Sequence, residues 1–85
     1  MSVRTERLQK LVDKLEERKT DLNKSTVDYI KSNIEAKGWT EKQVVARSRQ
    51  SRDSNEYHAN YGKPEYRELH QADAEIFSFV IDFLS

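Results

Sequence analysis

Basic side chains gather in the middle of the chain, with no acidic residue among them until Asp53. They are Lys42, Arg47, Arg49 and Arg52. Cations at such spacing can hold phosphate groups by charge alone, without side chains that recognise bases. The segment therefore predicts a surface for a polyanion. A solvated helix face is the alternative interpretation, because charged faces are common on surface helices.

Catalytic chemistry has no comparable set of residues. His58 and His70 are the only imidazoles, and no HExxH pattern, glycine-rich phosphate loop or nucleophile elbow accompanies them. A metal site built from the two histidines with Glu56 or Asp73 would fall short of the three or four protein ligands that zinc usually takes. The sequence therefore predicts a non-enzymatic protein with no metal site and no cofactor.

The composition favours a small helical protein. The chain has 85 residues, of which 35% are hydrophobic and 35% charged, with two glycines, one proline and no cysteine. This balance is typical of helices with narrow apolar seams, and the length predicts a single domain over residues 1–85. The charged N-terminus and the short apolar runs predict no signal peptide and no membrane span, which favours a cytoplasmic protein.

Charge is divided unequally along the chain, although the net charge is zero. Residues 1–52 hold thirteen Lys or Arg against eight Asp or Glu, whereas residues 53–85 hold two against seven. The asymmetry indicates nucleic acid or an oppositely charged protein as partner. Association of opposite ends of two copies is the alternative.

The N-terminal stretch predicts a long coiled-coil helix over about residues 3–37, since no Gly or Pro interrupts it. Leucines at heptad spacing form a seam along its first half. Beyond Leu22 the apolar positions shift phase around residues 23–26, as a stutter in one helix or as a break that Ser25 and Asp28 would cap. Continuity is favoured, because the helix formers on either side can bridge the shift.

Two further helices are predicted. Gly38 is suited to end the first helix, and Thr40 with Gln43 has the spacing of a capping box at the start of a basic helix over about 40–55. Turn-forming residues then predict a helix end followed by a loop within Asp53 to Lys63. Pro64 suits the first position of a C-terminal helix over about 64–84 that carries a dense apolar stripe.

These elements lead to two predicted surfaces. The apolar seams exceed what we expect one chain of this length to bury, so we predict an all-α homodimer or tetramer. Its interface is formed by Leu8, Leu11, Leu15, Leu22, Ile76, Val80 and Phe83. The predicted nucleic-acid surface comprises Lys24, Lys31, Lys37, Lys42, Arg47, Arg49 and Arg52.

The order of these features resembles the GapR family of bacterial nucleoid-associated proteins. The likeness lies in a leucine-bearing first helix with an LEERK segment, the EAKG helix end at residues 35–38, a basic second helix and an apolar C-terminal helix. Tyr57 and His58, followed by acidic and apolar residues, are also similar to the small double-stranded-DNA-binding protein of T4-like phages. The similarity extends loosely from Leu8 to Leu84.

The GapR resemblance implies an all-helical dimer or tetramer that clamps the backbone of overtwisted DNA with little base recognition. Lys37 and Lys42 match that family by position, whereas the arginines of residues 47–52 match only in character. The chain departs from the family in its zero net charge, its longer first helix and a tyrosine-rich insertion between residues 55 and 65.

The sequence thus favours backbone binding of double-stranded DNA with low sequence specificity, by a protein of the bacterial nucleoid or a phage-encoded protein in host cytoplasm. The alternative is a protein-binding regulator or inhibitor, phage-encoded or not. It would engage a host protein through its coiled coil and its acidic C-terminal half. A purely structural coiled-coil adaptor is the third hypothesis.

Overall fold

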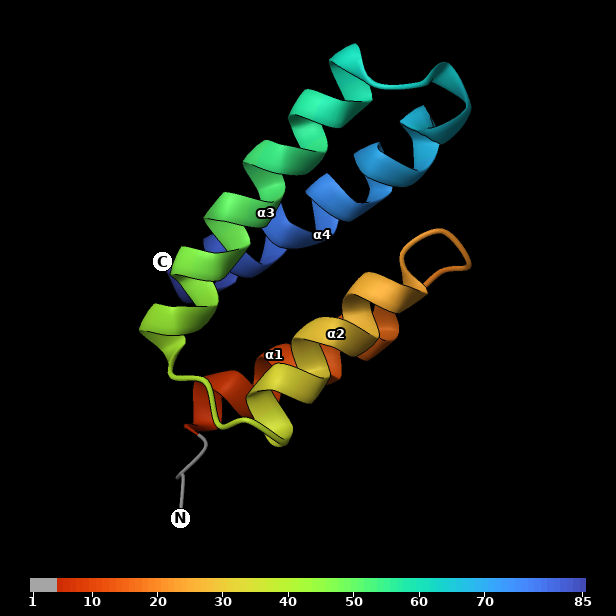
Figure 1. Ribbon diagram of the computed structural model, residues 1–85. Coiled ribbons are helices and arrows are strands. Elements are labelled where there is room, and N and C mark those ends of the chain that lie inside the picture. Colours follow the sequence, from red (N-terminus) through yellow and green to blue (C-terminus); the bar gives the residue numbers. More distant parts are fainter. Residues whose placement is uncertain (1–4) are drawn as a thin grey trace.

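The computed structural model describes residues 5–85 and contains helices only (Figure 1). They are α1 (Glu6–Glu17), α2 (Lys24–Glu35), α3 (Glu41–Tyr61), the 3-10 turn η1 (Pro64–Tyr66) and α4 (Arg67–Leu84). Helices α1 and α2 form one antiparallel hairpin, and α3 and α4 form a longer one packed beside it. Within residues 5–85, no helix is both long and apolar enough to cross a membrane.

The predicted long coiled-coil helix over residues 3–37, whose first two residues lie outside the described ones, is wrong, because the chain reverses between α1 and α2. Asn23 closes the turn: its side-chain carbonyl accepts from the Thr20 amide at 2.7 Å, and its amide group donates to the Arg18 carbonyl at 3.0 Å. The Thr20 hydroxyl in turn accepts from the Asn23 backbone N–H at 3.3 Å. The phase shift in the apolar pattern thus marks a break, where a buried asparagine takes the place of a glycine or proline.

Because the chain reverses at this break, the apolar residues of α1 and α2 pack against each other. Leu8, Leu11 and Leu15 of α1 are 0–2% exposed, and they share one core cluster with the apolar residues of α2 and α4. Ile76 and Val80 of α4 are buried as well, at 4% and 0% exposed. The compact four-helix fold therefore replaces the predicted oligomeric coiled coil. Five of the seven predicted interface residues are buried within the single chain. The other two are Leu22, which is 46% exposed, and Phe83, which is partly buried.

The joint between the hairpins has the predicted geometry. Gly38, which follows the end of α2, has a φ of 68°. A helix cannot continue through this left-handed conformation. The Thr40 hydroxyl accepts from the Gln43 amide at 3.2 Å, and the Gln43 side chain accepts from the Thr40 amide at 2.9 Å, so the capping box is confirmed. These contacts fix where α3 begins and which way it leaves the joint.

Replacing Gly38 with alanine is expected to lower the free energy of unfolding by about 1 kcal/mol, because a Cβ atom disfavours the left-handed backbone. Gly38→Asn should cost less, since asparagine tolerates this conformation better than alanine does. Urea denaturation followed by helical circular dichroism measures both losses. Equal losses in the two variants would contradict the backbone explanation.

The basic helix continues to Tyr61, so the loop predicted from Asp53 to Lys63 is also wrong. Contacts with α4 outweigh the weak helix propensity of this stretch: Ala59 is buried, and Asn55 bonds across to His70 at 2.9 Å. The chain turns only at Gly62, where a Cβ would lie 2.5 Å from the His58 carbonyl oxygen. Pro64 then opens the 3-10 turn that leads into α4.

Candidate nucleic-acid interface

The first half of α3 presents basic side chains without acidic partners. Lys42 and Arg49 are exposed, and neither forms an ion pair among residues 5–85. They border a shallow depression of about 330 Å³, which Val45, Ala46 and Leu84 also line. The carboxylate in this depression, that of Glu41, is paired with Arg7 of α1 at 3.3 Å. A net positive surface therefore faces solvent here.

Aromatic rings support a third cation at the joint. The Arg47 guanidinium lies 5.7 Å from the centre of the Trp39 ring, which stacks edge-on against Tyr29 at 6.1 Å. Such stacking orders an arginine while leaving its charge in place. Lys37, exposed after the end of α2, lies on the same connecting segment as Trp39. Arg47 of α3 thus lies against the connecting segment that also carries Lys37.

Arg52 completes this region only in part. Its guanidinium lies 3.3 Å from the carboxylate of the adjacent Asp53, and the arginine is half-buried. An exposed neighbouring pair of this kind contributes little stability, but it reduces the net positive charge available to an anion. We therefore place Arg52 at the edge of the interface.

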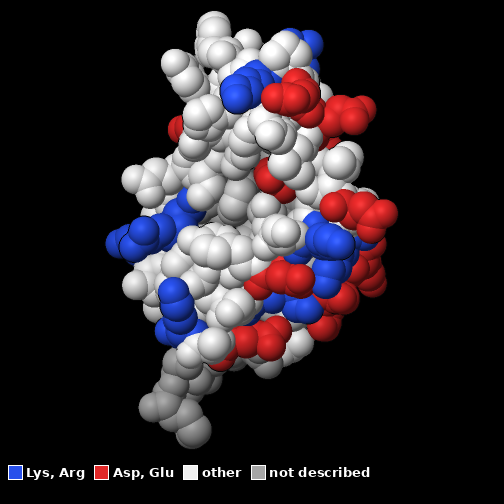
Figure 2. Space-filling model, turned by 45° about the vertical axis from the view of Figure 1, so that its right-hand side comes forward, with Lys and Arg blue, Asp and Glu red and all other residues white. Residues whose placement is uncertain are grey.

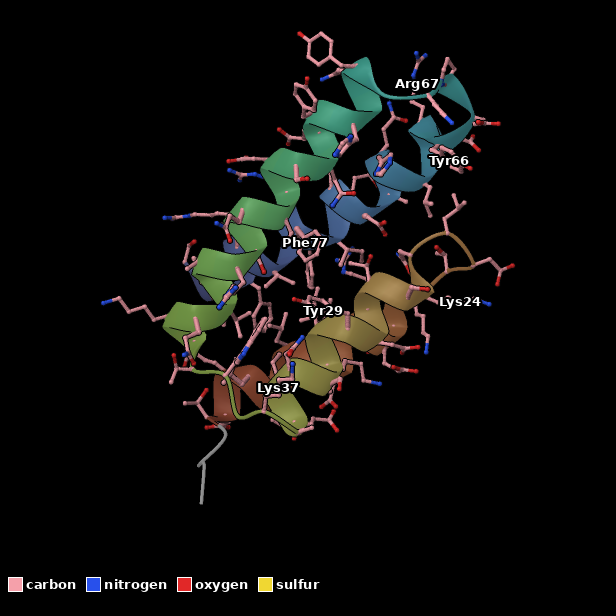
Figure 3. All side chains as sticks on the ribbon, viewed as in Figure 1. Lys24, Tyr29, Lys37, Tyr66, Arg67 and Phe77 are labelled. Carbon is pink, nitrogen blue, oxygen red and sulfur yellow. The ribbon has the colours of Figure 1, made fainter. Side chains whose placement is uncertain are left out.

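Lys24 and Lys31 do not join the other predicted cations. Lys31 is hydrogen-bonded to Glu16 of α1, which holds the pKa of the lysine above its usual value and that of the glutamate below its own. Lys24 starts α2 at the end opposite Lys37, as Figure 3 shows. The predicted surface of seven residues is thus divided: Lys42 and Arg49 line one depression, Arg47 lies against Trp39 of the segment that carries Lys37, and Arg52 is paired with Asp53.

Charge neutralisation distinguishes the two hairpins. In the α1–α2 hairpin, Lys19 bonds to Asp28 at 2.7 Å, which holds the pKa of that carboxyl below its usual value, and Lys14 lies 3.6 Å from Glu17. Figure 2 shows the contrast on one face, where basic and acidic side chains alternate on the right and basic side chains stand among uncharged ones on the left. Most cations of α1 are therefore committed to contacts within the chain.

An apolar groove lies on another part of the surface, between the α1–α2 turn and α4. It has a volume of about 470 Å³, and its apolar lining includes Leu22, Ile76 and Phe79. The Arg18 guanidinium covers Phe79 at 4.0 Å from the ring centre. The sequence pattern did not reveal this groove, because it forms only when the turn at Asn23 brings Leu22 beside α4.

Asp73 of α4 is the one described side chain with a shielded polar atom that lacks a hydrogen-bond partner, namely its Oδ1. Burial raises the pKa of the Asp73 carboxyl, while a hydrogen bond from Thr26 and the charge of His70 act in the opposite direction. Because the folded pKa lies above the unfolded one, the neutral form stabilises the fold. That stability is present at acid pH and is lost as the pH rises through the folded pKa.

Replacing Asp73 with asparagine is accordingly expected to raise the free energy of unfolding by about 1 kcal/mol at neutral pH. The gain should shrink as the pH falls toward the ordinary pKa of aspartate, because both side chains are then neutral. Urea denaturation across an acidic to neutral pH series measures it. Asp82→Asn, on the exposed side of the same helix, is the control and should change little. A gain that does not depend on pH would exclude the carboxylate as its source.

The GapR resemblance rests on the residues quoted for it and gains no support from other proteins. The chain matches no protein-family model, no curated protein and no solved structure.

Proposed function

We propose that the protein binds the phosphate backbone of double-stranded DNA through the first half of α3 and the joint before it. The observation that carries the proposal is the set of cations on this surface that have no carboxylate partner among residues 5–85, whereas the α1–α2 hairpin pairs all of its cations but Arg18 and Lys24 with carboxylates. The binding residues are Lys37, Lys42, Arg47 and Arg49, with Arg52 at the edge. Lys24 and Lys31 are no longer included.

The arrangement supports backbone contact more than base recognition. Arg47 is held against Trp39, and Arg52 is directed to Asp53, so neither guanidinium is free to pair with a base edge in the observed arrangement. Lys42 and Arg49 are exposed point contacts of the kind that position a protein on phosphates. We therefore expect similar affinity for duplexes of different sequence.

The test is the binding of a fluorescently labelled duplex, followed by anisotropy at about 50 mM and about 200 mM salt. Three or four phosphate contacts predict that the affinity falls with a logarithmic slope of roughly −3 to −4. Two duplexes of unrelated sequence should give the same slope. Absence of salt-sensitive binding to either duplex would refute the proposal.

A second candidate function is protein binding through the apolar groove beside Leu22. The groove is lined by apolar side chains and by both charge signs, from Glu17, Arg18 and Lys19 on one side and Glu75 of α4 on the other. This combination suits an amphipathic helix that inserts one apolar side chain. It predicts that Leu22→Glu abolishes partner binding and leaves any duplex binding unchanged. Loss of duplex binding in this variant would argue against two separate surfaces.

A further inference from the structure

Two histidines meet near one end of the α3–α4 hairpin. Figure 1 shows this end, where the chain passes from α3 to α4. The ring of His58, near the end of α3, and the ring of His70, near the start of α4, lie 5.3 Å apart between centroids and are inclined by 30°. The basic half of α3 is at the other end of the helix. The proposed DNA surface therefore leaves these two side chains without a role.

Asn55 fixes the orientation of the His70 ring. The Asn55 side-chain amide donates to the Ser51 carbonyl at 2.8 Å, so its carbonyl oxygen is the atom that faces His70 Nδ1 at 2.9 Å. A carbonyl oxygen only accepts hydrogen bonds, and His70 Nδ1 must therefore carry the proton. In the neutral ring, the lone pair is then on Nε2.

This arrangement is the one in which proteins present histidine to a metal ion. A ligating imidazole typically donates its other N–H to an oxygen acceptor, which holds the ring and raises the basicity of the free nitrogen. His70 is half-buried and anchored by Asn55, whereas His58 is exposed. His58 can therefore turn about its side-chain torsions until its nitrogen also reaches a shared ion.

We propose that His58 and His70 bind a divalent transition-metal ion of the zinc or copper class, with solvent completing the coordination. Imidazole nitrogen is a preferred ligand of these ions, and it suits the harder magnesium and calcium ions poorly. The negative balance of residues 53–85 favours a bound cation. No cluster of three or more His, Asp and Glu ligands exists among residues 5–85, so the site is open and exchangeable, unlike a closed structural zinc site.

Because the two proposed ligands lie on different helices, metal binding should be measurable as a change in thermal stability. An ion held by His58 of α3 and His70 of α4 binds the folded chain more tightly than the unfolded chain, so it should raise the thermal midpoint as its concentration exceeds the dissociation constant. The test is thermal unfolding of the protein with added Zn²⁺, with Mg²⁺ as the matched control ion. We expect a higher midpoint with Zn²⁺ and no change with Mg²⁺.

Variants connect the effect to the site. His58→Gln and His70→Gln should each abolish the Zn²⁺ shift while keeping the helical spectrum, and Asn55→Ala should reduce it by freeing the His70 ring. Histidine ring signals in proton NMR provide a second measurement, because Zn²⁺ should shift the resonances of both rings together. A Zn²⁺ shift that persists in either histidine variant, or a wild-type protein that Zn²⁺ does not affect, would overturn the proposal. Binding of duplex DNA is a separate measurement, and its outcome does not test the metal site.

Discussion

Replacing Leu15 with alanine is expected to lower the free energy of unfolding by about 3 kcal/mol. Leu15 is 0% exposed and lies in the cluster that joins α1 to α2 and α4, so its removal leaves a cavity and loses apolar contacts. Leu22→Ala is the matched control, because Leu22 belongs to the same heptad seam but is 46% exposed. We expect this control to cost about 0.5 kcal/mol or less.

Urea denaturation followed by circular dichroism distinguishes a seam buried within one chain from a seam shared between chains. If the single chain buries it, the difference between Leu15→Ala and Leu22→Ala should be the same at every protein concentration. A large loss for Leu22→Ala, with a midpoint that rises with protein concentration, would show that a second copy covers Leu22. Such a result would support the predicted oligomer.

The second large effect concerns the unpaired cations. A variant carrying Lys42→Gln and Arg49→Gln should bind duplex DNA about tenfold or more weakly near physiological salt, with equal losses for unrelated sequences. The logarithmic salt slope should flatten by about 0.9 for each lost phosphate contact. Folding should be unaffected, since both side chains are exposed and glutamine has good helix propensity.

Lys31→Gln is the matched control for this experiment, because Lys31 was predicted from sequence as part of the same surface but is bonded to Glu16. It should leave duplex affinity nearly unchanged. Anisotropy of labelled duplexes at several salt concentrations measures all the variants. A loss for Lys31→Gln as large as that for the double variant would mean that the ion pair opens on binding. A loss restricted to one sequence would indicate base recognition instead.

The sequence predicts most accurately what depends on neighbouring residues. The left-handed backbone of Gly38, beyond the end of α2, and the capping box between Thr40 and Gln43 follow from backbone conformation and local hydrogen bonds, and both are present. The helical class follows from the same kind of local preference. Such features need no knowledge of which helix packs on which.

The errors come from contacts between distant segments. The phase shift in the apolar pattern near residue 23 is compatible with a stutter in one helix and with a turn between two. The hydrogen bonds of Asn23 with Thr20 and Arg18 stabilise the turn. The stretch after Asp53 has the composition of a loop, yet α4 offers a surface that keeps it helical. In both cases tertiary burial outweighs local propensity.

The candidate site is limited in the same way. Charge counting finds all the basic residues, but it gives no indication that Lys31 has Glu16 as a partner while Lys42 has no carboxylate partner in the described part of the chain. The histidine pair is a clearer case, since residues 58 and 70 come together only because α3 and α4 are antiparallel. The spacing of these two histidines along the chain does not predict that their side chains come into contact.

Helices that pair with their neighbours in the chain can find each other quickly. Short connections join α1 to α2 and α3 to α4, so each hairpin closes with a small loss of chain entropy. Folds dominated by such local contacts reach the native state in microseconds to milliseconds. The unpaired apolar faces are then exposed to solvent for only a short time after synthesis. We therefore expect the α4 segment IFSFVIDFL, which would promote aggregation if it stayed exposed, to become buried soon after synthesis.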